Sequence, residues 1–196
     1  MNKILVTVAI VALSAGATAV ALLSRADAEP QSYTSPAPGN KAMTAADVTA
    51  DSYSVIPYML VRIYAAFDEK EEEAIYDGLA EVAAEDALEE LYLERVGALG
   101  SGGLEPDQTL HAMEVLRLNS TQQGDQVLID AQWRVVGTVG HDEHMHVRGN
   151  TYSANLQLAP VDDIWRIAAF DLTDIDRSEA GQTRREGSTD EWSAAN

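Results

Sequence analysis

Alternation of apolar with largely polar residues over positions 125–139 is the feature that most constrains the fold. Every second position of this stretch is apolar or glycine: Val127, Ile129, Ala131, Trp133, Val135, Gly137 and Val139. The positions between them include Asp130, Gln132, Arg134 and Thr138. Because successive side chains of a strand project to opposite faces, the pattern predicts an antiparallel strand with one face buried and the other in water.

Three further segments extend this strand into a meander that runs to residue 176. One strand is predicted before it at 111–119, and two after it at 148–158 and 164–172. Turn-forming residues separate them at 122–125 and 160–163. The sequence therefore predicts a four-stranded antiparallel sheet.

Helical periodicity precedes the strands. Apolar residues recur at spacings of three and four between residues 56 and 67, which predicts one buried helical face. Two more helices are predicted, one after Asp68 and one over 85–99, before a glycine-rich stretch. Thr44 and Asp47 fit a capping box, and Pro57 is expected in the first turn of the helix that follows.

Helices followed by a meander are typical of an α+β domain, here over residues 44–176, with N-terminal helices packed in a curved four-stranded antiparallel sheet. Residues 1–28 predict an export signal, with Lys3, an uncharged apolar run at 4–23 and an A-x-A sequence ending at Ala28. The run is also long enough for an uncleaved inner-membrane anchor, the only membrane contact we expect. Both interpretations place the domain outside the cytoplasm, in the periplasm or another extracytoplasmic compartment. We expect a flexible linker at 29–43 before the domain and a disordered polar tail at 177–196 after it.

Composition excludes several classes of function. The net charge of −19 argues against nucleic acid, because phosphate backbones require a positive surface. The chain has no cysteine, which excludes disulfides, thiolate metal sites and cysteine nucleophiles.

Short motifs then suggest a family. The last predicted hairpin resembles the closing hairpin of the NTF2-like superfamily, which includes ketosteroid isomerase and SnoaL-type proteins. The resemblance lies in residues 152–158, an acidic turn and Ile164-Trp165-Arg166-Ile167. The resemblance implies a cone in which a curved sheet wraps a helix. A closer likeness is to uncharacterised exported or membrane-tethered bacterial proteins, through residues 63–68, Trp133 and 139–141. Asp142 and Glu143 depart from that group, which tends to have Trp-Gly there, and the likeness implies no reaction.

Three of the four histidines lie within six residues, at His141, His144 and His146. Imidazoles beside carboxylates suit zinc or copper, so the cluster is a candidate metal site. The alternative is that these are turn and edge-strand histidines that form hydrogen bonds with the backbone. Without a bulge, His144 and His146 share a strand face with Tyr152. A predicted pocket at the mouth of the cone is then lined by His144, His146, Tyr152, Trp133 and Tyr64. A bulge at Gly149-Asn150 would swap the faces.

No catalytic residue is assigned. Asp130, Asp171 and His111 are candidates for a general base by strand position only, and no Ser-His-Asp order, phosphate-binding glycine loop or metalloprotease motif is present. Three functions remain open. The first, which we favour, is a non-catalytic extracytoplasmic accessory module that acts with a membrane-associated protein. The second is a zinc- or copper-binding accessory protein, and the third a small-molecule isomerase or hydrolase. The sequence indicates no oligomeric state.

Overall fold

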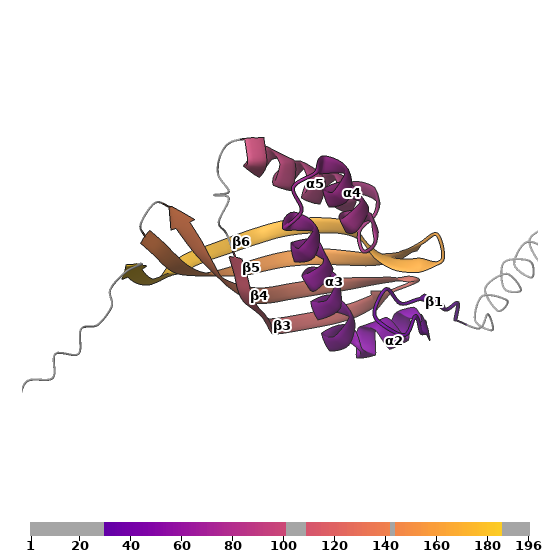
Figure 1. Cartoon of the computed structure of the whole chain (residues 1–196). Coiled ribbons are helices and arrows are strands. Elements are labelled where there is room, and N and C mark those ends of the chain that lie inside the picture. The colour runs from indigo at the N-terminus through magenta and orange to yellow at the C-terminus, as the bar shows by residue number, and fades with distance from the viewer. Residues whose placement is uncertain (1–29, 101–108, 142–143, 186–196) are drawn as a thin grey trace, which may run out of the picture. The chain divides into compact units, whose positions relative to one another are not determined.

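The computed structural model describes residues 30–100, 109–141 and 144–185 (Figure 1). The chain divides into two compact units, Met1–Gln31 and Ser32–Asn196. The predicted signal or anchor at 1–28 lies outside the described residues, which begin at residue 30. The second unit contains the predicted α+β domain.

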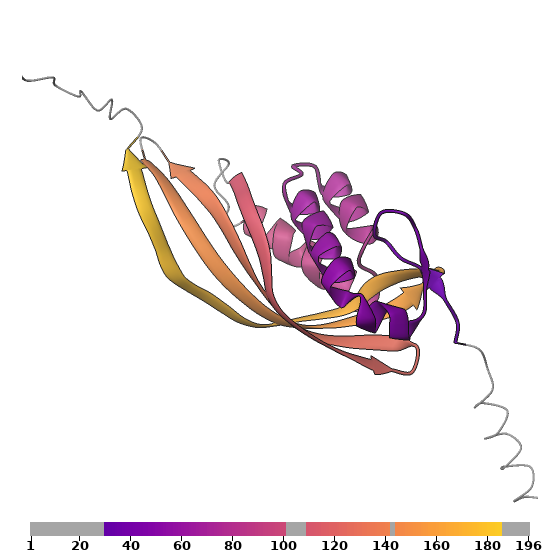
Figure 2. The ribbon, with the colours of Figure 1, turned by 90° about the horizontal axis from the view of Figure 1, so that it is seen from below.

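Four long strands form an antiparallel meander, as the alternation predicted. They are β3 (Thr109–Gln123), β4 (Gln126–His141), β5 (His144–Val161) and β6 (Ile164–Arg185). The pairing of β4 with β5 runs from Val127 opposite Leu158 to His141 opposite His144 without a register shift. Shifts occur instead in the flanking pairs, β3 with β4 and β5 with β6. Such irregularities locally increase the bend and twist of a strand, and the strands curve along their length (Figure 2).

The prediction of a four-stranded, wholly antiparallel sheet is wrong. Two short strands, β1 (Tyr33–Thr34) and β2 (Ala42–Met43), extend the sheet to six strands in the order β2-β1-β6-β5-β4-β3. The β1 strand runs parallel to β6, with Thr34 opposite Ile164. The sheet is therefore mixed, within an architecture that is still α+β.

Tertiary contacts explain why this N-terminal arm is ordered despite its prolines and glycine. The Trp165 indole N–H donates to the Met43 carbonyl at 2.9 Å, and the Tyr33 ring meets Trp165 edge-on with centroids 5.7 Å apart. Trp165 is fully buried, so the arm completes the environment of one of the two tryptophans in the core. Neither contact leaves a periodic signal in the sequence.

Four helices are described: α2 (Ala45–Ala50), α3 (Ser52–Phe67), α4 (Glu72–Ala80) and α5 (Glu85–Gly100). The capping box is confirmed, because the Thr44 side chain accepts from the Asp47 N–H and the Asp47 side chain accepts from the Thr44 N–H. Pro57 lies inside α3, beyond the first turn where it was expected. The helices cover one face of the sheet (Figure 2), which we call the inner face. Their buried side chains meet those of the inner face in one core.

A close approach fixes the packing of α3 against α4. Gly78 of α4 faces Ala66 of α3, and a Cβ atom at Gly78 would lie 2.9 Å from the Ala66 Cβ. Ala66 is buried, so it has little room to move away. The separation of the two helices therefore depends on the absence of a side chain at Gly78.

Gly78→Ala should lower the free energy of unfolding by about 1–2 kcal/mol, because overpacking outweighs the gain of roughly 1 kcal/mol in helix propensity. Urea unfolding followed by circular dichroism measures this. The double variant Gly78→Ala/Ala66→Gly should be more stable than the sum of the two single effects, since it restores the space. A Gly78→Ala protein more stable than wild type would contradict the packing.

Candidate functional site

Three of the five residues predicted to line a pocket meet on the inner face. They are Tyr64 of α3, Trp133 of β4 and Tyr152 of β5, and the last two are register partners. The rings of Trp133 and Tyr152 stack with centroids 5.6 Å apart and planes 17° apart. The Trp133 indole N–H donates to the Tyr64 hydroxyl at 3.0 Å. We call these three residues the aromatic cluster.

The aromatic cluster is packed rather than hollow. Trp133 is 2% exposed, and Phe170 of β6 meets its ring edge-on at 6.5 Å. The Asn150 amide donates to the Tyr152 hydroxyl at 3.2 Å, which holds the outer ring of the stack. Burial raises the pKa of Tyr64 far above its ordinary value, an effect that the hydrogen bond from Trp133 only partly opposes. Tyr64 is therefore a neutral phenol at ordinary pH, acting as acceptor for the indole.

The three clustered histidines are placed by the backbone register. His141 and His144 are register partners, and His146 pairs with Val139. Because β4 and β5 pair without a shift, the bulge that would swap faces does not occur between them, and these positions fall on the same face as Trp133 and Tyr152. The side chains of His141, His144 and His146 lie outside the described part of the structure.

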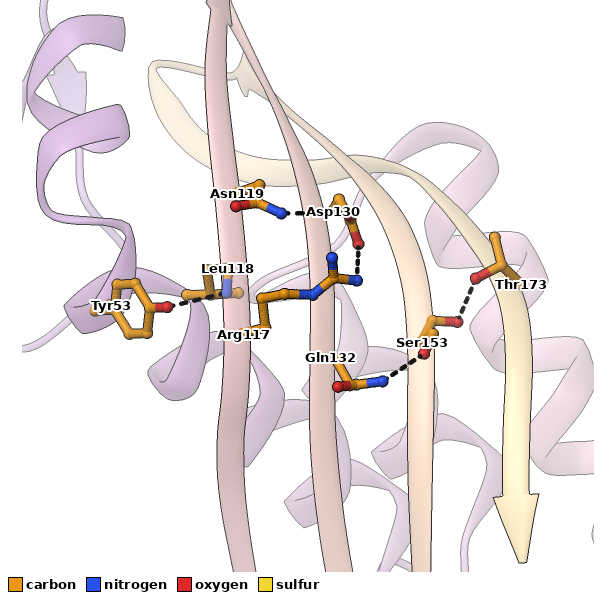
Figure 3. Close-up of polar contacts among 8 residues, drawn as sticks. All are labelled: Tyr53, Arg117, Leu118, Asn119, Asp130, Gln132, Ser153 and Thr173. Carbon is orange, nitrogen blue, oxygen red and sulfur yellow. Dashed lines mark hydrogen bonds and ion pairs between the residues drawn. The ribbon is translucent and has the colours of Figure 1, made fainter.

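The candidate bases lie away from the aromatic cluster. On the outer face, Asp130 accepts from Arg117 at 3.1 Å and from Asn119 at 3.4 Å (Figure 3). Asp171 is exposed and accepts from Asn155 at 3.5 Å. His111 is also exposed, with its Nε2 atom 3.0 Å from the Thr138 hydroxyl. The structure shows no contact between any of these three groups and Tyr64, Trp133 or Tyr152, the predicted pocket residues whose side chains it describes.

The outer face of the sheet carries a network of polar side chains across all four long strands. Gln132 donates to the Ser153 hydroxyl at 3.3 Å, and the Thr173 hydroxyl donates to the Ser153 carbonyl at 2.9 Å (Figure 3). These exposed or half-buried groups satisfy one another across the strands, which is the usual arrangement of a solvated sheet face.

One shallow hollow lies between the N-terminal arm and the helices. Its volume is about 170 Å³, and its lining includes Ser35, Tyr58 and Glu81. This is below the roughly 300–1,000 Å³ of typical small-molecule sites. Within residues 30–100, 109–141 and 144–185, no group of three or more His, Asp or Glu side chains that the structure describes is placed to hold a metal ion. No helix in those ranges meets the length and hydropathy of a membrane span.

Sequence periodicity missed one functional candidate, the solvent-facing side of α3. Tyr53, Pro57, Val61 and Ala65 follow one another at intervals of four and so form one stripe. Tyr53 and Val61 are 59% and 52% exposed, and the Tyr53 hydroxyl at the start of the helix also accepts from the Leu118 N–H of β3 at 3.1 Å (Figure 3). We call these four residues the α3 stripe. The signal was present in the sequence, since Arg62 is the single charged residue among the 16 of α3.

Comparison with protein-family models, curated proteins and solved structures finds no match for this chain.

Tyr64→Phe should lower the free energy of unfolding by about 1–3 kcal/mol, because it leaves the buried Trp133 N–H without its acceptor. Denaturant titration followed by tryptophan fluorescence measures this. The matched control is Tyr76→Phe, which removes a hydroxyl at an exposed position of α4. An unfolding free energy equal to that of the control would show that the Tyr64–Trp133 bond does not stabilise the fold.

The same variant should also change the response to alkali. Because the pKa of Tyr64 is raised in the folded state, the unfolded chain releases this proton at a lower pH than the folded chain does. The stabilisation that the neutral Tyr64 phenol gives to the fold is therefore complete below a pH of about 10 and is lost as the pH rises above it. The stability of wild type should therefore fall more steeply above pH 10 than that of Tyr64→Phe. Parallel slopes in unfolding series at increasing pH would rule out this linkage.

Proposed function

We propose that the chain is a non-catalytic binding module that acts outside the cytoplasm with a membrane-associated protein, and that the α3 stripe is its docking surface. The apolar run at 4–23 and the proline-containing segment after it support the compartment. The exposure of the α3 stripe supports the docking role and is the observation that carries the proposal.

The α3 stripe differs in charge from the exposed sides of α4 and α5. A helix that is apolar all round is usually buried on all sides, yet α3 buries one side against the sheet and exposes the other. Its only charge, Arg62, is half-buried and paired with Glu81, the residue that follows α4. By contrast, α4 and α5 carry exposed carboxylates such as Glu73 and Glu90. Uncharged contiguous surface on a strongly charged domain is typical of an interaction site.

Charge indicates what kind of partner fits. Asp51 precedes α3, and Asp68 and Glu69 follow it, all of them exposed. An apolar centre with acidic ends suits a protein surface that presents apolar side chains flanked by lysine or arginine. A second copy of this chain is disfavoured, because two molecules of net charge −19 repel each other. Anionic lipid headgroups are disfavoured for the same reason.

Val61→Glu should abolish docking without unfolding the domain. The substitution places an unpaired carboxylate at the centre of the α3 stripe, which should lower partner capture roughly tenfold or more. Because Val61 is exposed and Glu is a good helix former, the unfolding free energy should change by only about 0.5 kcal/mol. The measurement is quantitative capture of proteins from detergent-solubilised membranes of the native host by the full-length chain.

Leu93→Glu provides the matched control. Leu93 is 58% exposed on α5, so the same change of charge falls on a different helix at similar exposure. A partner lost with Val61→Glu and retained with Leu93→Glu supports the proposal. Equal capture by both variants would overturn it. If Val61→Glu instead dissociates a dimer seen by light scattering, the occupant is a second copy.

A further inference from the structure

We infer that the free edge of β3 is a latent pairing surface for a second copy of this chain, and that the side chain of Tyr53 keeps it closed. The surface is the run 117–123, whose backbone would pair with the same run of the other molecule. This goes beyond the proposed docking function and is tested without a docking partner. The hydrogen bond between Tyr53 and Leu118 carries the inference (Figure 3).

The β3 strand is the last strand of the sheet. Among the described residues it pairs with β4 alone, so its other edge has no neighbouring strand. Such an edge is a template on which another chain can add a strand, and soluble proteins protect it in recognisable ways. The first part of this edge is protected by irregular pairing, because the register with β4 shifts twice before Arg117.

The second part of the edge has no such irregularity, because the run 117–123 pairs with β4 without a shift. Backbone groups of successive residues point to opposite edges of a strand, and the Leu118 N–H points to Tyr53 rather than to β4. The N–H and C=O groups of Leu118, Ser120 and Gln122 therefore face the free edge. They form a regular row onto which a strand can be added.

Tyr53 occupies one position along this row. It lies in the first turn of α3, and its hydroxyl accepts from the Leu118 N–H at 3.1 Å. A carbonyl oxygen of an added strand would accept from the same N–H at about 2.9 Å, so the hydroxyl and an added strand exclude each other. The ring that carries the hydroxyl would also have to move before a strand could pair there. Tyr53 therefore protects the regular part of the edge as the register shifts protect the first part.

The run 117–123 suits pairing with itself. In an antiparallel pair centred on Ser120, Leu118 of one molecule faces Gln122 of the other, and its N–H can donate to the Gln122 carbonyl. The single charge of the run, on Arg117, then faces an uncharged residue, so no like charges meet. Self-complementary contacts about a two-fold axis are the commonest in homo-oligomers. The net charge of −19 opposes pairing at long range, so high ionic strength should favour it.

Sedimentation velocity of the full-length chain at high ionic strength tests the inference. Tyr53→Ala opens the edge, so its dimer dissociation constant should be at least about tenfold lower than that of wild type, since each molecule gains a free Leu118 N–H. The matched control is Val61→Ala, which shortens another exposed residue of the α3 stripe and should behave as wild type. Adding Ser120→Pro to Tyr53→Ala removes an edge-facing N–H and should restore the monomer, because an edge strand tolerates proline at such a position.

Amide hydrogen exchange locates the contact. In the Tyr53→Ala dimer, the N–H groups of Leu118 and Ser120 should exchange at least about tenfold more slowly than in the monomer of the same variant, because both enter the new pairing. A Tyr53→Ala chain that stays monomeric, or a dimer that leaves these amides unprotected or survives Ser120→Pro, would overturn the inference. Circular dichroism verifies that each variant is folded. No partner protein is present, so the result is separate from that of the capture experiment with Val61→Glu.

Discussion

The unshifted pairing of β4 with β5 is the constraint on which the rest of the structure depends. Side chains alternate between faces with a period of two, so a slip of one residue would move the inner row of either strand to the solvent. That row includes Ile129 and Trp133 of β4 and Leu156 and Leu158 of β5, all buried. The same register stacks Trp133 on Tyr152 and aligns His141 with His144. The core, the aromatic cluster and the alignment of His141 with His144 therefore follow from one pairing.

The sequence predicted this centre well because its signal is local. Alternation over positions 125–139 lies within one segment of the chain. It arises because one face of the strand is buried and the other faces water, so no knowledge of the rest of the fold is needed to recognise it. The same holds for the capping box of Thr44 and Asp47, a contact between residues three apart. By contrast, β1 and β2 have two residues each, too few for any period, and are held by Trp165 from the far end of the chain. A parallel strand so formed cannot be read from local pattern, which is why the sheet was predicted with too few strands.

The two candidate sites, the aromatic cluster and the α3 stripe, also differ in how far the sequence could reveal them. Tyr64, Trp133 and Tyr152 meet on the inner face, and their packing follows from size, because large aromatic rings close a gap between helix and sheet that smaller residues would leave open. The α3 stripe was missed for a different reason. Periodicity identifies the buried side of a helix, and once Ile56 and Met59 define that side, the other is expected to be polar. What marks the α3 stripe is the absence of charge, which a search for apolar spacing does not register.

Electrostatics sets the conditions under which the proposed docking should occur. Docking of a basic protein depends on charges spread over a surface, whose attraction salt screens over about 10 Å at 0.1 M. Raising the ionic strength at constant pH should therefore weaken the partner complex.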